Sequence, residues 1–462
     1  MNRVTKRTWL MGLFVLILVG GMVFFVWDYW NHASAWISAP GSPHVSNRTN
    51  VGVGTITDRF GTVLLDMDGE RTYSPSESTR KSTLHWVGDR QGKISAGAVS
   101  GYAGAMVGYD PVNGIYNAEG SGGGVTTLTL SERVQNTALE ALAGRKGTVA
   151  VYNYKTGEIL CAVTAPTFDP DNVPDIEGDT TGTYEGVYLN RFLQSAYVPG
   201  SIFKVVTAAA ALEHVSGIQE ESFRCTGTMT YGEGENTATV TCENAHGTVS
   251  LKTALAKSCN CAFAQIAEKI GRKNMLKAVE SYQVVEPLSF DGVTAARGNY
   301  DLTQAGAVSF AWSCIGQHTD LVNPARFMAF MGAIAGGGTA AKPYVVSRVT
   351  CGGEVTYEAK TVDMDRIMDR ETAETLKAYL RSNVQNVYGD GNFNGLSVCA
   401  KSGTSQLGGE EISNAMFAGF VADEKYPLAF IAVVEHAGYG ASAAMPVAAK
   451  VLTACAAAMD KG

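Results

Sequence analysis

The most continuous apolar stretch of the chain lies near its start. Residues Trp9 to Trp27 are 19 consecutive uncharged, mostly apolar residues. As a helix they would span roughly 28 Å, about the thickness of a membrane's hydrocarbon core. The pattern predicts a transmembrane anchor over residues 9–27. The alternative is a cleaved signal peptide, because Ala33-Ser34-Ala35 resembles a small-residue cleavage site, although the apolar stretch is long for one.

Basic residues predict how this anchor is oriented. Arg3, Lys6 and Arg7 lie in the short tail 1–8, whereas no further Lys or Arg occurs until Arg48. Because basic residues favour the cytoplasmic side of a membrane, we predict a cytoplasmic N-terminus and place everything after Trp27 outside the cytoplasm. The polar, aperiodic residues 28–50 are typical of a tether.

A small region follows the tether. An alternating run from Val51 to Leu65 predicts a hairpin, and a glycine-dense stretch ends at Gly124. These glycines have no GxGxxG spacing between a strand and a helix, so we expect no phosphate-binding loop and no nucleotide cofactor. We assign residues 51–130 to a small, extended N-terminal region.

The pattern changes after Leu130 to that of a compact α/β domain, which we place over 131–458. Helical periodicity starts at Ser131, two strand-like runs follow, and a mostly helical middle extends to about residue 335. Three more strand-like runs come late in the chain. The five expected strands are 148–154, 158–164, 397–404, 415–422 and 427–436. We therefore expect an α/β (α+β) fold with one sheet, whose first strands pair with its last, flanked by helices and a helical subdomain.

Composition narrows the function classes. The 462 residues carry 36 Lys and Arg against 44 Asp and Glu, a net charge of −8, and 45% of them are hydrophobic. The high hydrophobic fraction excludes a disordered chain. The net negative charge argues against a nucleic-acid partner, which would require an excess of basic residues.

Nine cysteines invite a search for disulfides and metal sites. Cys225 and Cys242 flank a polar, glycine-rich stretch that looks like a hairpin, and they are the one disulfide candidate, with two free thiols as the alternative. Cys259 and Cys261 stand beside no paired histidine, so we expect no metal there.

Common hydrolase motifs are absent from the sequence, which has neither a GxSxG elbow nor HExxH. Ser-x-x-Lys occurs twice, at Ser78/Lys81 in an apparently irregular polar run and at Ser201/Lys204 at the start of an apolar helix. On a helix these positions share a face, so the amine can reach the hydroxyl and act as its base. Such a lysine must lose its proton near neutral pH, which costs about 4 kcal/mol. The alternative for Ser201 is a helix cap.

Two further motifs could complete a site. Ser258-Cys259-Asn260 lies between two helical segments, where a hydroxyl could pass a proton and an amide could bind a carbonyl; the alternative is a helix cap. In the strand-like run containing Lys401, Ser402, Gly403 and Thr404, the cation and hydroxyls could hold a carboxylate, while glycine leaves room for a ligand. The alternative is an edge strand with an exposed lysine. Lys155-Thr156-Gly157 repeats this motif but fits a hairpin turn.

These motifs occur in the order Ser-x-x-Lys, Ser-x-Asn, Lys-Ser-Gly, a set known from β-lactamases and penicillin-binding proteins. The chain resembles class B penicillin-binding proteins, the D,D-transpeptidases of cell-wall synthesis. The resemblance extends from about 130 to 458, more loosely over 51–130, and includes YVPGSIFKVVTAAAALE, HGTVSLKTALAKSCNCAFAQIAEKIG and IGQHTDLVNPARFMAFMGAIAGGG. It implies a penicillin-binding transpeptidase or serine β-lactamase-like fold.

The resemblance also implies roles for the motif residues. Ser201 would attack the penultimate D-Ala carbonyl of a stem peptide after Lys204 takes its proton. Ser258 would relay a proton to the departing D-Ala, and Asn260 would bind the peptide amide.

The third motif would hold the substrate's other end. Lys401, Ser402 and Thr404 would bind the terminal carboxylate beside Gly403, and the backbone N–H groups of Ser201 and Thr404 would form the oxyanion hole. An amine from a neighbouring stem peptide would then resolve the acyl-enzyme.

The implied partners are peptidoglycan stem peptides, β-lactam antibiotics, the membrane and a membrane glycan polymerase; no cofactor or metal is implied. Two features depart from the family. His318 stands where a glycine is usual, and the N-terminal region is short, which argues against the usual polymerase contacts.

Three alternative functions share this fold. A class A β-lactamase would need a Glu-x-x-Leu-Asn element after the nucleophile, but the nearest string, Glu185 to Asn190, has the wrong spacing and precedes Ser201. A membrane-anchored β-lactam sensor would need signalling machinery. This chain has one predicted span and only eight residues before it, which is too little for that. A catalytically silent cell-wall scaffold would fail to bind penicillin covalently.

Overall fold

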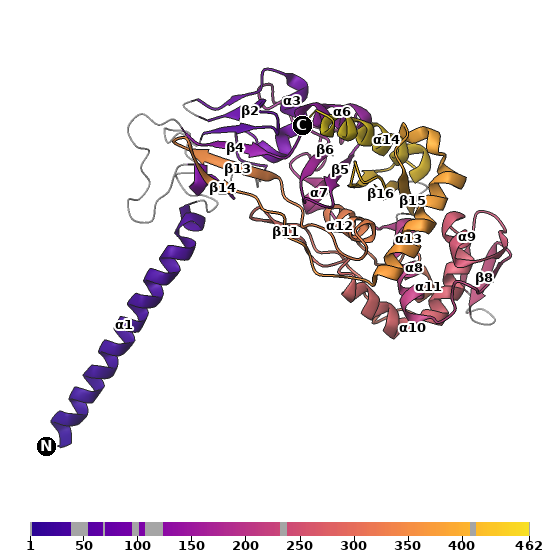
Figure 1. Ribbon diagram of the computed structural model, residues 1–462, viewed down its shortest axis with the longest axis horizontal. Coiled ribbons are helices and arrows are strands. Elements are labelled where there is room, and N and C mark those ends of the chain that lie inside the picture. Colours follow the sequence, from indigo (N-terminus) through magenta and orange to yellow (C-terminus); the bar gives the residue numbers. More distant parts are fainter. Residues whose placement is uncertain are drawn as a thin grey trace.

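The structure is a computed structural model and describes residues 2–37, 54–67, 70–94, 101–106, 123–231, 238–406 and 413–461. One helix, α1 (Asn2–Ile37), extends away from the folded body (Figure 1). Its apolar part, Val4–His32, is long enough to cross a membrane and is not buried against the rest of the protein. The helix continues beyond the predicted anchor, so the first part of the predicted tether 28–50 is helical, and residues 38–50 lie outside the described residues.

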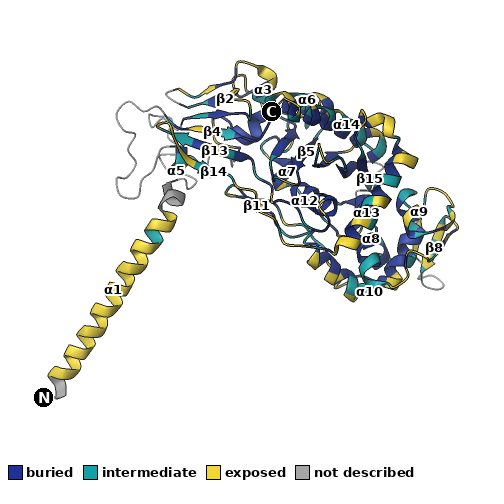
Figure 2. Ribbon diagram, viewed as in Figure 1, coloured by how far each residue is buried: buried dark blue, intermediate teal, exposed yellow. Residues whose placement is uncertain are grey.

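The central sheet has the order β15-β16-β17-β5-β6, with every neighbouring pair antiparallel. Because β17 pairs with β5, the predicted pairing of the first strands with the last is confirmed. Every residue of β5, β6, β16 and β17 is buried, which explains their nearly continuous apolar sequences (Figure 2). The strands are β5 (Gly147–Asn153), β6 (Ile159–Ala165), β15 (Val398–Gln406), β16 (Ser413–Val421) and β17 (Leu428–Val434).

Helices cover both faces of this sheet. Side chains alternate between faces along a strand, so Val149 and Val151 join one hydrophobic cluster while Ala150 and Tyr152 join the other. The first cluster contains α6 (Glu132–Leu142) and α14 (Gly440–Met459); the second contains α12 (Pro324–Ala335) and α13 (Arg370–Asn383). Although α14 is also apolar and long, half of it is buried, as befits a helix packed on a sheet.

The helical middle lies against one end of the sheet. Its helices are α7 (Arg191–Gln194), η1 (Gly200–Phe203), α8 (Lys204–His214), α9 (Leu251–Ala256), α10 (Asn260–Ser281) and α11 (Ala307–Ser313). Between α8 and α9 the hairpin predicted around Cys225 and Cys242 is confirmed. It consists of β7 (Phe223–Cys225), β8 (Thr228–Tyr231), β9 (Ala238–Thr241) and β10 (Gly247–Val249). Gly271 has a non-helical backbone with a φ of 72° and kinks α10.

A second sheet, in the order β14-β13-β4-β1-β2-β3, forms the core of the N-terminal region. The predicted hairpin is confirmed as β1 and β2. Two strands of this sheet come from the later domain, because β13 pairs with β4. The domain limits 51–130 and 131–458 stay predictions. The strands are β1 (Thr55–Thr57), β2 (Val63–Asp66), β3 (Thr72–Tyr73), β4 (Val125–Leu128), β13 (Val346–Cys351) and β14 (Glu354–Glu358).

Several short elements complete the described chain. They are α5 (Ala103–Met106), β11 (Ser289–Phe290), β12 (Val293–Thr294), η3 (Val384–Tyr388) and η4 (Asp390–Phe393).

The polar run around Ser78 is helical, so its interpretation as irregular is wrong. It forms α3 (Glu77–Val87), whose N-cap Ser76 accepts a hydrogen bond from the backbone of Thr79. Polar residues of this helix are buried because α6 offers them partners; Ser82 Oγ, for example, donates to Asn136 Oδ1 at 2.7 Å. The hydrophobic pattern misses this helix because part of its buried face is polar.

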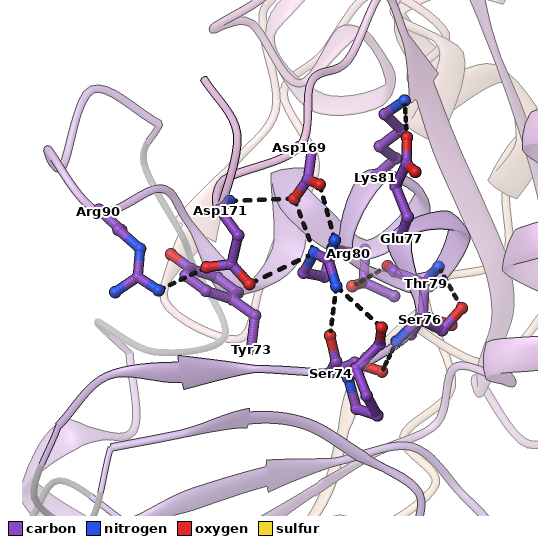
Figure 3. Close-up of polar contacts among 12 residues, drawn as sticks. Tyr73, Ser74, Ser76, Glu77, Thr79, Arg80, Lys81, Arg90, Asp169 and Asp171 are labelled. Carbon is purple, nitrogen blue, oxygen red and sulfur yellow. Dashed lines mark hydrogen bonds and ion pairs between the residues drawn. The ribbon is translucent and has the colours of Figure 1, made fainter. Parts of the chain in front are cut away.

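An ion pair joins α3 to the segment after β6 (Figure 3). Arg80 Nε and one of its terminal nitrogens each lie 2.7 Å from a different oxygen of Asp169. The same guanidinium donates to the backbone oxygens of Ser74 and Pro75, each at 3.0 Å. This bidentate contact fixes the small N-terminal region against the main body.

Candidate active site

Ser201 and Lys204 meet at the start of the helical middle. Ser201 lies in η1, a 3₁₀ turn that leads into α8, and residues three apart are eclipsed in such a turn. Lys204 Nζ lies 2.8 Å from Ser201 Oγ. Ser201 is partly exposed, whereas Lys204 is fully buried beneath it. The serine can therefore meet a ligand while its neighbouring amine is shielded from water.

Lys204 is surrounded by uncharged oxygen acceptors. Its Nζ donates to Asn260 Oδ1 at 2.6 Å and to the backbone oxygen of Ser258 at 2.9 Å, and it lies 3.1 Å from Ser258 Oγ. No carboxylate lies within ion-pair distance of this amine in the described part of the chain. A buried lysine without an anionic partner favours its neutral form.

The electrostatics of both buried lysines favour neutral amines. Burial and the charge of Lys401 lower the pKa of Lys204 well below its ordinary value. Burial lowers the pKa of Lys401 to about 7. Since a neutral amine can accept a proton, Lys204 has the position and the electrostatics of a general base.

Ser258 and Asn260 project from the junction of α9 and α10. Ser258 has a left-handed backbone, with φ at 54°, and its Oγ lies 3.1 Å from Lys204 Nζ and 3.2 Å from Lys401 Nζ. Cys259, rather than Asn260, is the N-cap of α10. Asn260 is instead held by Lys204 and by Thr241, whose backbone oxygen accepts from Asn260 Nδ2 at 2.7 Å.

The third predicted motif lies on β15, an edge strand of the sheet. Lys401 is 1% exposed, which excludes the alternative of a solvent-exposed lysine, and its Nζ donates to the backbone oxygen of Ser402 at 2.8 Å. Ser402 and Thr404, the next two polar residues of this strand, are partly exposed. The two lysine amines are thus buried, whereas the hydroxyl-bearing residues of the same strand are partly accessible.

Two glycines allow η1 to approach β15. A Cβ added at Gly200, whose φ is 54°, would lie 2.4 Å from the backbone oxygen of Thr404. A Cβ added at Gly403 would lie 2.8 Å from the backbone oxygen of Pro199. Side chains at these positions would push the nucleophile away from the strand.

One supporting residue escaped the sequence analysis. Tyr388, in η3, accepts from the backbone N–H of Ser402 at 2.9 Å and lies 3.0 Å from Ser402 Oγ. It is buried and stacks edge-on against Phe417. A single tyrosine in a polar run carries no pattern that would identify it.

The other Ser-x-x-Lys pair does not form such a site. Ser78 is exposed, and Lys81 Nζ forms an ion pair with Glu77 Oε1 at 2.5 Å (Figure 3). Lys155, of the second Lys-Thr-Gly, lies in the turn between β5 and β6 and pairs with Glu424, as expected for a structural position.

The cysteines behave differently from expectation. Cys225 and Cys242 are free, with their sulfur atoms 3.7 Å apart. The expectation that Cys259 has no histidine beside it is wrong: folding brings His246 and these three cysteines together, with one possible ligand atom from each within 4.8 Å of the others. The sequence does not reveal this cluster, because its residues are far apart along the chain and are brought together only when the hairpin packs against the start of α10.

His318, which replaces the family's usual glycine, keeps a glycine-like backbone. Its φ is 74°, a conformation in which residues with a Cβ are uncommon. The side chain is exposed and lies 3.2 Å from Thr319 Oγ1. The exposed His318 thus has a backbone conformation that glycine adopts more readily.

The fold and the convergence of these three motifs point to the penicillin-binding transpeptidase family. The model of the penicillin binding protein transpeptidase domain matches residues 147–453. The chain therefore belongs to this family, and its relatives place it among the class B penicillin-binding proteins.

Named relatives support this membership. The chain is 26% identical over 321 residues to the peptidoglycan D,D-transpeptidase PbpA of Mycolicibacterium smegmatis, covering 65% of this chain and 64% of PbpA. It is 28% identical over 348 residues to the stage V sporulation protein D of Bacillus subtilis, covering 70% of this chain and 51% of that protein. The matches thus span about half to just under two thirds of these relatives.

Solved structures show the same fold. The D,D-transpeptidase domain of a peptidoglycan glycosyltransferase from Eggerthella lenta superimposes with a TM-score of 0.75 at 26% identity, covering 90% of this chain and all of that one. The ceftriaxone acyl-enzyme of penicillin-binding protein A from M. tuberculosis gives 0.74 at 21% identity, covering 87% and 98%.

Proposed function

We propose that this protein is a peptidoglycan D,D-transpeptidase, which cross-links stem peptides through an acyl-enzyme on Ser201 and is acylated by β-lactams. The observation that carries the proposal is the contact of 2.8 Å between Ser201 Oγ and a fully buried Lys204 amine. The names of the relatives, peptidoglycan D,D-transpeptidases among them, support the same reaction.

Acylation begins at the hydroxyl. Lys204 takes the proton of Ser201 while Oγ attacks the carbonyl carbon of the penultimate D-Ala, and the carbonyl oxygen becomes an oxyanion. The backbone N–H groups of Ser201 and Thr404 stabilise that charge. When the peptide bond breaks, Ser258 delivers a proton to the departing D-Ala nitrogen; its contacts with both Lys204 and Lys401 suit a relay.

Substrate binding uses the remaining groups. Lys401, Ser402 and Thr404 attract the terminal carboxylate, and the peptide extends along β15 beside Gly403. Asn260 still has one N–H and one lone pair beyond its contacts with Thr241 and Lys204, which it offers to the peptide amide. Lys204 is neutral again once its first proton has passed through Ser258 to the departing D-Ala. An amine of a second stem peptide then attacks the ester carbonyl and gives a proton to Lys204, which passes it to Ser201 Oγ as that oxygen leaves.

The apolar helix α1 suits a chain that acts at the membrane surface. We propose that α1 anchors the protein with Arg3, Lys6 and Arg7 in the cytoplasm and the catalytic domain outside, where stem peptides are found. A membrane glycan polymerase is proposed as a partner because the anchor would hold both proteins in one plane.

Labelled penicillin tests the proposal. We expect the full chain to form a long-lived penicilloyl adduct in an intact-mass measurement, and Ser201→Ala to abolish it. Ser78→Ala, which changes the matching serine of the other motif, serves as control and keeps the adduct.

Other outcomes would assign other functions. Persistent labelling of Ser201→Ala would overturn the site. Rapid release of hydrolysed antibiotic would indicate a β-lactamase, and no adduct on a folded protein would indicate a catalytically silent scaffold.

A further inference from the structure

A cluster of metal-binding side chains lies directly behind the Ser-x-Asn motif. Cys225 ends β7, Cys242 follows β9, His246 precedes β10, and Cys259 is the N-cap of α10. Their Sγ atoms and one imidazole nitrogen all lie within 4.8 Å of one another. Three thiols and an imidazole therefore converge from three segments: the end of β7, the loop between β9 and β10, and the start of α10.

Three of the six distances between these four atoms match the edges of a tetrahedral metal site, and the other three are no longer than 4.8 Å. With Zn–S bonds of about 2.3 Å, two sulfurs of a tetrahedral site lie about 3.8 Å apart, and a sulfur and a nitrogen about 3.6 Å apart. The observed separations are 3.7 Å for Cys225–Cys242, 3.9 Å for Cys242–Cys259 and 3.5 Å for Cys225 Sγ to His246 Nδ1. Each agrees with the ideal edge to about 0.1 Å.

We propose that Cys225, Cys242, His246 and Cys259 bind one Zn²⁺ as a closed Cys₃His site. Three soft sulfurs and one imidazole in a tetrahedral arrangement form a ligand set that prefers Zn²⁺ to harder metal ions. All four protein ligands are supplied, so the site has no open position and is structural. Binding displaces the protons of the three thiols to solvent and leaves three thiolates, a neutral imidazole and the ion, with a net charge of −1.

Backbone groups around the sulfurs support thiolates. The N–H of Cys261 points to Cys242 Sγ at 3.3 Å, and that of Ala262 points to Cys259 Sγ at 3.4 Å. Both belong to the first turn of α10, a helix of 22 residues, whose N-terminus favours negative charge. Such outer hydrogen bonds are typical of metal-bound thiolates.

A disulfide explains the cluster less well. One S–S bond would use two sulfurs at about 2.0 Å and leave the third thiol and the imidazole without a role. Cys261, whose Sγ lies 3.6 Å from Cys242 Sγ, stays outside the set of four because its sulfur turns to the backbone oxygen of Val240 at 3.7 Å. The structure thus separates four ligands from one neighbouring cysteine, which provides a matched control.

The site would position the catalytic Ser-x-Asn motif. Cys259 stands between Ser258 and Asn260, and Cys242 follows Thr241, whose backbone oxygen holds the Asn260 amide at 2.7 Å. A metal bound to both cysteines ties the hairpin to the start of α10 and fixes that amide. This positioning role rests on the proposed function, whereas the metal site itself does not.

Metal analysis of the full chain, purified in detergent under reducing conditions, tests the site. We expect one zinc per chain, and after replacement with Co²⁺ the intense visible bands of tetrahedral cobalt thiolates. His246→Ala and Cys225→Ser lose the metal, whereas His246→Cys retains it as a Cys₄ site. Cys261→Ser and Cys351→Ser, cysteines outside the four, keep one zinc.

Contrary results are equally specific. Failure of the wild type to bind stoichiometric zinc, a Cys225–Cys242 disulfide in place of the metal, or zinc retained by His246→Ala at wild-type affinity would overturn the site. Loss of metal from Cys261→Ser would overturn the choice of four ligands.

Penicillin labelling tests the positioning role separately. We expect His246→Ala to label about 10-fold or more slowly, and His246→Cys to recover the wild-type rate. Equal rates with and without bound zinc would overturn the positioning role. Ser201→Ala should bind zinc but no penicillin, so a failure of the proposed reaction is distinguishable from a failure of the metal site.

Discussion

The two Ser-x-x-Lys segments of this protein have the same spacing on helices but different surroundings. In α3 the side chain of Lys81 is 36% exposed and pairs with Glu77 one turn earlier. At the start of α8, Lys204 is fully buried, contacts Ser201, Ser258 and Asn260, and has no carboxylate beside it within the described ranges. The comparison teaches that spacing brings an amine near a hydroxyl, but only burial without a counter-ion makes the amine a base.

The difference originates in tertiary packing rather than in the helices themselves. Gly200 and Gly403 let η1 approach β15, so the wall that buries Lys204 is built from a strand two hundred residues later in the chain. That strand also brings Lys401, whose charge disfavours a second ammonium. Helix α3 has Glu77 in its first turn instead, and an ion pair favours the charged lysine.

The largest expected effect is a loss of acylation when the lysine of the second Ser-x-x-Lys motif, but not that of the first, is replaced. Lys204→Met should lower the rate of penicillin acylation by about 10²–10⁴-fold, because a general base is lost. Lys81→Met, the same change in the other motif, should leave the rate unchanged. Acylation is measured with fluorescent penicillin, and thermal midpoints show whether both variants are folded. Similar losses in both variants would remove the distinction between the motifs.

A smaller effect concerns a buried base on the same helix as Lys81. His85 is buried, and its Nε2–H donates to the backbone oxygen of Val187 at 2.8 Å. Burial, and then the charge of Arg191, lower the pKa of His85 to about 4. In the unfolded chain this histidine titrates near pH 6.5. The free energy of unfolding should therefore be fully present above pH 6.5 and fall by about 3 kcal/mol towards pH 4. Within the described chain no hydroxyl hydrogen-bonds to this imidazole, so its burial affects stability and not a reaction.

His85→Gln tests this pH dependence, because glutamine can still donate to Val187 but does not titrate. Denaturant unfolding between pH 7 and 4.5 should show a steeper loss of stability for the wild type than for His85→Gln. The partly buried His214, changed to Gln, is the matched control and should keep the wild-type slope. Parallel slopes for the wild type and His85→Gln would contradict the assignment.

The smallest effect is expected at the exposed ion pair. Glu77→Gln should destabilise the protein by less than about 0.5 kcal/mol, since exposed pairs at this spacing contribute little. It should leave penicillin labelling unchanged. A change in acylation rate on this substitution, measured beside Lys81→Met, would show that the two motifs communicate.

Much of the architecture was accessible from local pattern. Continuous apolar runs predicted β5, β6, β16 and β17 because these strands are buried on both faces, and the order of the three motifs singled out Ser201 as the predicted nucleophile. Helix α3 was missed because its buried face carries threonines and serines that find partners on α6, and hydrophobic periodicity does not register such residues.

By itself the sequence determined the strands of the sheet, the apolar N-terminal helix and the residues Ser201, Lys204, Ser258, Asn260 and Lys401 as a set. Only the tertiary structure decided that Lys204 is buried from solvent and that Tyr388 hydrogen-bonds to Ser402. It also decided that β13 joins the N-terminal sheet and that His246 lies beside three cysteines. The physical reason is that local patterns follow from the periodicity of one segment, whereas burial, charge neighbours and ligand geometry depend on segments that only folding brings together.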